Sequence, residues 1–159
     1  MYRILFVCTG NICRSPTAEG IVRQMLEEVG LGDTIVVDSA GTYDGHVGQS
    51  PDTRARMAAR AHGWNLDTLI ARAFEKEDFS DFDLILGMDR GHVRQLRAMA
   101  PMDQRGRVRL FLDFSDDHQG QDVPDPYGRE AEEYRLALDL IEAGSRALVD
   151  KLMTERPDQ

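Results

Sequence analysis

The sequence predicts a single doubly wound α/β domain, with a central four-stranded parallel sheet flanked by helices on both faces. Two observations predict this class. Short, continuously apolar runs alternate along the chain with segments of helical periodicity, as expected for strands that helices cover on both sides. The chain has 159 residues, enough for one domain with one substantial core. We expect residues 1–155 to form this domain and residues 156–159 to be a frayed tail.

Four apolar runs are the predicted strands, namely residues 4–7, 35–37, 84–86 and 108–112. Each is short and dominated by Ile, Leu, Val or Phe, which is typical of a strand buried on both faces. In such sheets, ligands bind beyond the carboxyl ends of the strands. The first of these ends is Val7, so we expect a site directly after it.

Helical periodicity and end signals define the segments between the first strands. Ser15-Pro16 opens the first helix, whose apolar residues follow Ala18 at helical spacing until Gly30 provides the stop. Ser50-Pro51 has the pattern of an N-cap and first helical residue for an Ala/Arg-rich helix that ends at His62-Gly63.

Two further helices follow the third and fourth strands. Asp89 is the predicted cap of a helix that stops before Pro101. The last helix covers residues 130–152 and carries one stripe of inward-facing residues, Tyr134, Leu138, Ile141, Ser145, Leu148 and Leu152.

Composition excludes several classes of function. Acidic residues outnumber basic ones by 28 to 19 and the formal net charge is −9, so we expect neither nucleic acid nor a membrane as a partner. No apolar stretch approaches the roughly 20 residues of a membrane span, and the first residues lack the pattern of a signal peptide. Both cysteines lie in one short loop, a poor disulfide framework, which favours a cytoplasmic location.

The segment from Cys8 to Ser15 joins the first predicted strand to the first predicted helix. Its backbone N–H groups and the helix N-terminus converge on one point, an arrangement that binds anions. Gly10 and Asn11 tolerate the left-handed backbone that a tight anion-binding loop requires. Arg14 adds a planar guanidinium that suits two phosphoryl oxygens.

Cys8 lies at the mouth of this loop. The helix dipole, the N–H groups and Arg14 favour its thiolate, and a thiolate beneath a bound phosphate is placed for in-line attack on phosphorus. The Ser15 hydroxyl can donate to the sulfur. Taken singly, a buried small Cys8, an N-cap Ser15 and a solvated Arg14 are the commoner roles. Their combination at a strand–loop–helix junction favours catalysis.

Asp125-Pro126-Tyr127-Gly128 follows the fourth strand on the edge of the sheet where the site is expected. Pro126 stiffens the loop, and a carboxyl group held over a bound phosphate would protonate the leaving oxygen. The same four residues are equally typical of a plain turn. The spacing alone leaves both interpretations open.

Residues 8–16, CTGNICRSP, resemble the signature loop of the low-molecular-weight protein-tyrosine phosphatases. The likeness continues through most of the chain, at Asp52, Arg54 and residues 38–42, 46–48, 62–63, 76–79, 88–89 and 123–128. The resemblance implies hydrolysis of protein phosphotyrosine and small aryl phosphates through a cysteinyl-phosphate, with no cofactor or metal. It implies that Cys8, Arg14 and Asp125 are catalytic.

The resemblance also assigns supporting roles. The implied substrate-binding residues are Thr9, Gly10, Asn11, Ile12, Cys13, Ser15 and Tyr127. Ser39, His62 and Asp89 match positions that form a hydrogen-bond network around Asn11. Relatives that act on phosphoarginine tend to have Thr at the position of Ile12, so Ile12 favours phosphotyrosine.

Two positions depart from the family's pattern. Gly45 stands where the family often has Trp, and Gly128 stands where a second Tyr usually follows the one that matches Tyr127. The aromatic slot for a phenyl ring is therefore thinner than usual, and Tyr43 is the candidate that completes it.

Cys13 is either a small buried residue or the partner of Cys8 in a reversible disulfide that protects the nucleophile, which we favour. Three alternative functions stay open: an arsenate reductase on the same scaffold, a phosphoarginine phosphatase and a non-catalytic phosphate-binding module. The first passes a disulfide to further cysteines, and the chain has only two. The expected partners are phosphotyrosine-bearing proteins, a tyrosine kinase among them, and phosphate or similar oxyanions. We expect a monomer or weak dimer.

Overall fold

The computed structural model describes residues 1–155, which are built around a four-stranded parallel sheet with strand order β2-β1-β3-β4. The strands are β1 (Tyr2–Cys8), β2 (Ile35–Gly41), β3 (Leu84–Gly87) and β4 (Val108–Leu110). Residues 156–159, predicted as a frayed tail, lie outside the described residues.

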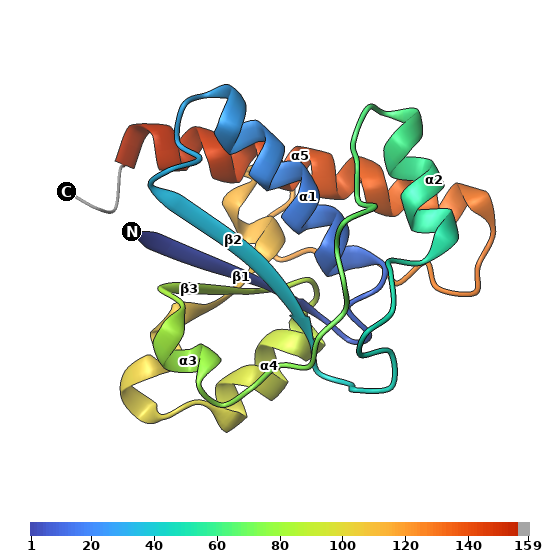
Figure 1. The fold of residues 1–159 in the computed structure, drawn as a ribbon. Helices are drawn as coiled ribbons and strands as arrows, with labels where there is room; N and C mark the ends of the chain where they lie inside the picture. Colours follow the sequence, from blue (N-terminus) through green and yellow to red (C-terminus); the bar gives the residue numbers. More distant parts are fainter. Residues whose placement is uncertain (156–159) are drawn as a thin grey trace.

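Helices cover both faces of the sheet, as predicted. Helices α1 (Arg14–Glu28) and α5 (Ala131–Glu155) lie on one side, and the short α3 (Asp78–Asp81) and α4 (Arg90–Met99) lie on the other (Figure 1). Helix α2 (Thr53–Ala61) packs against α1 and α5. The predicted doubly wound class is therefore confirmed.

The side chains of β1 explain why its sequence is apolar without alternation. Ile4, Phe6 and Cys8 join the core beneath α1 and α5, whereas Leu5 and Val7 join the core beneath α4. All five are buried, because successive strand residues point to opposite faces and both faces are covered. The apolar stripe predicted for α5 is buried as well.

Several element ends differ from the predictions. Helix α1 begins at Arg14 with Cys13 as N-cap, so Ser15-Pro16 lies inside the first turn rather than at the start. Proline is tolerated there because the first N–H groups of a helix have no intrahelical acceptor. The fourth strand ends at Leu110, because Phe111–Phe114 forms the 3₁₀ helix η2 instead of continuing the predicted strand.

The cap of α2 is Asp52 rather than Ser50-Pro51. The Asp52 carboxylate accepts hydrogen bonds from the backbone N–H groups of Arg54 and Ala55 at 3.2 and 3.3 Å, which a proline-flanked serine two residues earlier could not supply. The stops predicted at Gly30 and Gly63 are confirmed, since both follow their helices with φ of 79° and 89°. Strands β1 and β2 and helix α5 extend further than predicted. Asp89 caps α4 as predicted.

The strand register gathers the carboxyl ends of three strands. Cys8 pairs with Gly41, and Val7 pairs with Gly87. The chain leaves β1 toward β2 and later returns on the other side to β3, so a crevice opens beyond Cys8. A Cβ on Gly41 would lie 2.6 Å from the Thr9 carbonyl oxygen, so glycine permits the loop after β1 to pack onto β2. Within residues 1–155, no helix is long and apolar enough to span a membrane.

Candidate active site

A cavity of about 220 Å³ opens beyond the carboxyl end of β1. Its lining comprises Cys8, Thr9, Gly10, Ile12, Cys13, Arg14, Tyr43, His46, Asp125 and Tyr127. The fold thus brings together the loop after β1 and the Asp125 segment, which lie more than a hundred residues apart in the sequence. Asn11, Ser15 and Asp89 lie behind this lining, in contact with residues that form it, and Ser39 contacts Asn11.

The sulfur of Cys8 is surrounded by hydrogen-bonding groups. Its Sγ lies 2.9 Å from the hydroxyl oxygen of Ser15, and the backbone N–H of Asn11 donates to it at 3.3 Å. Both groups reach the sulfur because the loop curls back over the end of β1. Donors aimed at a sulfur stabilise its charged form, as a nucleophile and again as a leaving group.

Asn11 holds this curl in place. Its φ is 56°, the left-handed region, and it is the only residue other than glycine with positive φ among residues 1–155. Its side-chain Nδ2 donates to the hydroxyls of Ser15 and Ser39, each at 2.8 Å. Its Oδ1 accepts the backbone N–H of Arg72 at 3.0 Å. Because Ser15 accepts from Asn11, its own hydrogen is available to the sulfur of Cys8.

Two residues outside the predicted set, Glu19 and Arg72, complete this network. Ser39 donates to Glu19 Oε1 at 2.6 Å, and Glu19 also pairs with Arg23 one helical turn later. Burial raises the pKa of Glu19, although the hydrogen bond from Ser39 and the charge of Arg23 oppose the shift. The signal available in the sequence was an acidic residue on the apolar side of α1, directly after Ala18.

Arg72 is the other missed residue. Its guanidinium bridges Asp38 on β2 and Asp78 at the start of α3, with N–O distances of 3.1 and 3.0 Å. Burial works against the charge, but the two carboxylates outweigh it and raise the pKa of Arg72. This clamp holds the backbone of Arg72 against Asn11.

Arg14 is buried, with 3% of its surface exposed, and is anchored on one side. Its Nη1 donates to Asp89 Oδ2 and to the Val123 carbonyl oxygen, both at 2.9 Å. Its Nη2 lies 3.8 Å from Asp125 Oδ2 at the cavity. Burial would raise the pKa of Asp89, but hydrogen bonds from the His92 N–H and Arg14 outweigh it and lower the pKa.

Two of the three residues predicted to surround Asn11 lie elsewhere. Asp89 holds Arg14 instead, because as the N-cap of α4 it sits beyond the end of β3. His62 ends α2 and faces α5, where its Nδ1 lies 2.7 Å from Glu142 Oε1. Only Ser39 contacts Asn11 as predicted.

His62 nevertheless belongs to a cluster that the sequence spacing did not reveal. His62, Asp139 and Glu142 place potential metal-ligand atoms within 4.8 Å of one another. Both Glu142 oxygens already take part in contacts within the protein, with His62 and with the Trp64 indole N–H at 3.1 Å. The cluster therefore links α2 to α5.

The Asp125 segment forms a turn at the edge of the cavity. Asp125 Oδ1 accepts the backbone N–H of Tyr127 at 3.1 Å, and Gly128 has φ of 74°, so the segment is a turn. The side chain of Asp125 is 53% exposed, and Oδ2 points toward Arg14 at the cavity. The turn thus holds the carboxylate at the cavity, beside Arg14.

Aromatic side chains form one wall of the cavity. The His46 ring lies between Tyr43 and Tyr127, with ring centroids 5.9 Å apart on each side. A Cβ on Gly45 would lie 2.2 Å from the Tyr43 ring, so Tyr43 occupies the space that a larger residue at position 45 would fill. Tyr43 therefore lines the cavity, as predicted from the missing Trp.

Gly10 permits close contact with His46 in the aromatic wall and does not adopt a left-handed backbone. It is not among the residues with positive φ, contrary to the prediction for Gly10. A Cβ at this position would instead lie 3.0 Å from Cδ2 of His46. Glycine therefore lets the imidazole rest on the loop.

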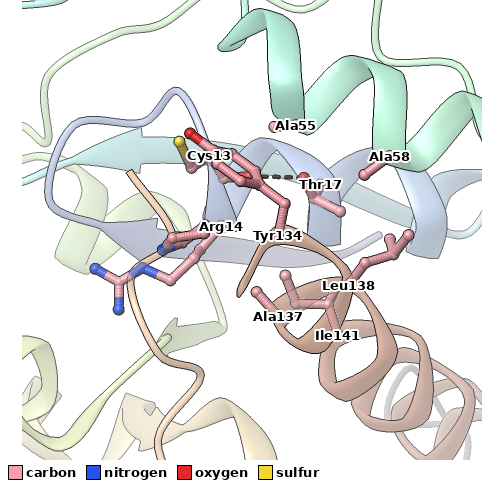
Figure 2. Close-up of a pocket in the computed structure, with 10 residues that line it drawn as sticks. Cys13, Arg14, Thr17, Ala55, Ala58, Tyr134, Ala137, Leu138 and Ile141 are labelled. Carbon is pink, nitrogen blue, oxygen red and sulfur yellow. Dashed lines mark hydrogen bonds between the residues drawn. The ribbon is translucent and has the colours of Figure 1, made fainter. Parts of the chain in front are cut away.

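Cys13 lines the cavity on one side and, on the other, contacts the space between the loop and helices α2 and α5. It is 5% exposed and, like Cys8, a free thiol. Burial, with the nearby charge of Asp52, raises the pKa of Cys13. In Figure 2 Cys13 stands beside Thr17, whose hydroxyl donates to its carbonyl oxygen at 2.6 Å, while the guanidinium of Arg14 points away from α5. Burial thus favours the neutral thiol of Cys13.

A thiol at the end of a central parallel strand, a loop whose backbone N–H donates to that thiol, and a buried arginine at one cavity define a class of α/β enzymes. Enzymes of this class attack phosphate esters with a thiolate and bind the phosphoryl group electrostatically. Comparison with known proteins identifies the family within this class.

The low molecular weight phosphotyrosine protein phosphatase family matches residues 3–158. A low molecular weight protein-tyrosine-phosphatase of Streptomyces coelicolor is 42% identical over 151 residues, which cover 93% of this chain and 92% of that protein. A protein tyrosine phosphatase from Entamoeba histolytica has a crystal structure with a TM-score of 0.92 and 32% identity, covering 98% of this chain and 99% of that one. Wzb of Vibrio vulnificus, in complex with benzylphosphonate, has a TM-score of 0.83 and 32% identity, covering 95% and 99%.

The chain therefore belongs to the low molecular weight phosphotyrosine protein phosphatase family. It is a hydrolase that acts on phosphotyrosine through the cysteine chemistry of that family. Arsenate reduction, phosphoarginine hydrolysis and a non-catalytic role are not favoured by these relatives.

Proposed function

We propose that three residues carry phosphotyrosine hydrolysis in this chain: Cys8 as nucleophile, Arg14 as the phosphoryl-binding residue and Asp125 as the acid and base. The observation that supports these roles is their convergence on one cavity. Cys8 has donors on its sulfur, and Arg14 is anchored by Nη1 with its Nη2 at the cavity beside Asp125.

In the first step, the thiolate of Cys8 attacks phosphorus and the bond from phosphorus to the phenolic oxygen breaks. Asp125 gives its proton to that oxygen, so tyrosine leaves as a neutral phenol. Arg14 and the loop N–H groups bind the equatorial oxygens, where the negative charge of the transition state is spread. The product is a cysteinyl-phosphate on Cys8.

In the second step, water attacks the phosphorus of the cysteinyl-phosphate. Asp125, now a carboxylate, takes a proton from the water, and the sulfur of Cys8 leaves as a thiolate. The hydroxyl of Ser15, 2.9 Å from the sulfur, supports the charge that returns there. Release of inorganic phosphate restores the enzyme.

The wall of the cavity supports specificity for aryl phosphates. Tyr43, His46 and Tyr127 offer ring faces and edges to a phenyl group, and Ile12 adds an apolar floor. Wzb binds benzylphosphonate, which combines a phosphoryl-like group with a phenyl ring. We infer that the same combination is bound here.

We further propose that residues 1–155 act as one catalytic domain, working in the cytoplasm as a monomer or weak dimer. Its substrates are phosphotyrosine-bearing proteins, with a tyrosine kinase among the candidates. The loop also binds phosphate and similar oxyanions. Because the whole chain carries a net charge of −9, anions are attracted by Arg14 and the N–H groups of the loop from Cys8 to Ser15, and not by the charge of the protein as a whole.

Hydrolysis of an aryl phosphate in the presence of a chelator tests this assignment. We expect Cys8→Ser and Arg14→Ala to lower kcat by about 10³-fold or more. Asp125→Asn should lower it by about 10²-fold. The exposed pair Arg90–Asp122 supplies matched controls, because Arg90→Ala and Asp122→Asn remove the same groups outside the cavity lining.

The outcomes separate the competing functions. Activity that survives in Cys8→Ser would refute the role of Cys8. Arsenate reduction with a thiol donor, or tight phosphate binding without turnover, would favour the reductase or the non-catalytic module. A Cys8→Ser variant that retains binding would also capture phosphotyrosine proteins and identify the substrate.

A further inference from the structure

His92 is a buried histidine that contacts the active-site loop from α4. It is the third residue of α4 and is 4% exposed. Its ring Nε2 lies 2.9 Å from the hydroxyl oxygen of Thr9. Thr9 directly follows Cys8 and lines the cavity. The reaction described above gives His92 no role.

The two ring nitrogens of His92 face different partners. Nδ1 lies 3.3 Å from the backbone N of Asp89 and 3.1 Å from Asp89 Oδ1, and Nε2 lies 2.9 Å from the Thr9 hydroxyl. Burial lowers the pKa of His92, against the charge of Asp89, and so favours the neutral ring. With Nδ1 accepting the Asp89 N–H, the hydrogen of the neutral ring is on Nε2, which donates to Thr9. The hydroxyl hydrogen of Thr9 is consequently turned away from His92.

The same histidine fixes the anchor of Arg14. Asp89 Oδ1 accepts the backbone N–H of His92 at 2.9 Å, which leaves Oδ2 to accept Arg14 Nη1 at 2.9 Å. The two hydrogen bonds between Asp89 and His92 form a reciprocal capping box. His92 therefore contacts both the residue that follows the nucleophile and the carboxylate that holds the phosphoryl-binding arginine.

A glycine at the end of β3 permits this arrangement. A Cβ on Gly87 would lie 2.8 Å from Val93 Cγ2 and 3.2 Å from His92 Cβ. Without a side chain at position 87, the first turn of α4 packs directly against the strand end. Gly87 lies beside Val7 in the sheet, so His92 is brought to the loop that begins one residue later.

We propose that His92 is a positioning residue for phosphoryl transfer, which locks Thr9 and the Asp89–Arg14 pair into one fixed arrangement around Cys8. The inference rests on the proposed function, since it takes Cys8 and Arg14 to be the acting groups. Small displacements of reacting groups cost more in rate than in substrate binding. Loss of the His92 contacts should therefore lower kcat and leave KM nearly unchanged.

The first test is a double-mutant cycle on the contact between His92 and Thr9. His92→Asn retains an acceptor for the Asp89 N–H but is too short to reach Thr9, and Thr9→Val removes only the hydroxyl. For aryl phosphate hydrolysis we expect each variant to lower kcat by about 10-fold with KM changed less than about 2-fold. The double variant should be no worse than either single variant. Thr9→Ser should recover most of the kcat lost in Thr9→Val.

His118→Asn is the matched control. His118 also contacts a serine hydroxyl, with its Nδ1 2.9 Å from Ser115 Oγ, but it lies outside the cavity lining. We expect its kcat to equal that of the unaltered chain. Unaltered kcat in His92→Asn, or multiplicative losses in the double variant, would overturn the proposal.

The second test does not depend on activity. Nitrogen chemical shifts of the His92 ring distinguish the two neutral tautomers, and we expect hydrogen on Nε2 with Nδ1 bare. A ring protonated on Nδ1 would overturn the proposal. Because Cys8→Ser keeps the ring and its contacts, the same signature is expected in that inactive variant. A failed assignment of Cys8 is thereby distinguished from a failed assignment of His92.

Discussion

The backbone N–H of Arg72 donates to the side-chain Oδ1 of Asn11 at 3.0 Å, across 61 positions of sequence. This single bond determines how the Asn11 amide is oriented. With Oδ1 occupied by a donor, both Nδ2 hydrogens face acceptors, the hydroxyls of Ser15 and Ser39. The hydroxyl of Ser15 can then give its hydrogen to the sulfur of Cys8. A segment far from the loop thus sets the hydrogen bonding of the nucleophile.

Replacement of Asn11 separates its backbone role from its side-chain role. Asn11→Ala and Asn11→Gly both lose the network, so both should show lower kcat. Alanine also has to adopt φ near 56°, which costs an L-residue about 1–2 kcal/mol more than glycine. We therefore expect Asn11→Ala to be less stable than Asn11→Gly by that amount, measured by denaturant unfolding. Equal free energies of unfolding would show that the left-handed backbone carries no strain.

Loss of the Arg72 clamp should affect stability and activity together. Arg72→Gln leaves the carboxylate of Asp78, which is 5% exposed, without its cationic partner. We expect a loss of about 3 kcal/mol in the free energy of unfolding, because an uncompensated buried charge is costly. The kcat for an aryl phosphate should also fall, since the backbone N–H that holds Asn11 is released. Arg94→Gln, at an exposed position on α4, is the control and should change neither quantity. An active Arg72→Gln of normal stability would contradict the clamp.

The position of Tyr43 over Gly45 predicts a specific effect on aromatic substrates. Gly45→Ala forces the Tyr43 ring aside, because the new Cβ would lie 2.2 Å from it. Tyr43→Ala removes the ring. Aromatic contacts contribute about 0.5–1.5 kcal/mol, so both variants should raise KM for aryl phosphates by about 2- to 10-fold. An alkyl phosphate should show little change in KM. Val47→Ala, at an exposed position, is the control and should leave KM unchanged. An equal rise in KM for aryl and alkyl phosphates would argue against an aromatic slot.

Stability should fall in mild acid because of His92. Burial lowers the pKa of His92 below its ordinary value of 6.5, against the opposing charge of Asp89. As the pH falls, His92 in the unfolded chain takes up a proton at a higher pH than His92 in the folded chain. The contribution of the neutral ring to the free energy of unfolding is therefore complete above pH 6.5 and is lost as the pH falls below that value. Arg14, Asp125 and Asp122 also act on the ring, Arg14 with the burial effect and the two carboxylates against it.

Comparison of the unaltered chain with His92→Asn isolates the contribution of His92 to the pH dependence of stability. Free energies of unfolding measured from pH 7.5 down to pH 5 should decline more steeply in the unaltered chain than in His92→Asn, which lacks the imidazole. Histidines and carboxylates that do not interact with the His92 ring are common to both chains and cancel in the comparison. Parallel curves would mean that His92 titrates equally in the folded and unfolded states.

Local sequence patterns were sufficient where neighbouring residues decide the structure. The apolar run of β1, the stop at Gly30 and the cap at Asp89 were predicted correctly, because each depends on hydrogen bonds or burial within a few residues. Predictions that relied on matching distant positions were less reliable. His62 was assigned to the network around Asn11, yet its place at the end of α2 turns it toward α5 and Glu142.

By itself the sequence determined the doubly wound class, the loop from Cys8 to Ser15 and its likeness to one family of phosphatases. The fold class follows from the spacing of apolar residues along the chain, and the loop and the likeness follow mainly from one continuous segment, residues 8–16. Only the tertiary structure decided which residues support the loop: Arg72 for Asn11, Asp89 for Arg14 and His92 for Thr9. Their separations along the chain range from 61 to 83 positions. The register of β1 with β2 and β3, and the hydrogen bond from the Gly41 N–H to the Arg72 carbonyl oxygen, bring them together. A buried polar group is satisfied by whatever donor or acceptor the fold places beside it, and no local pattern records that choice.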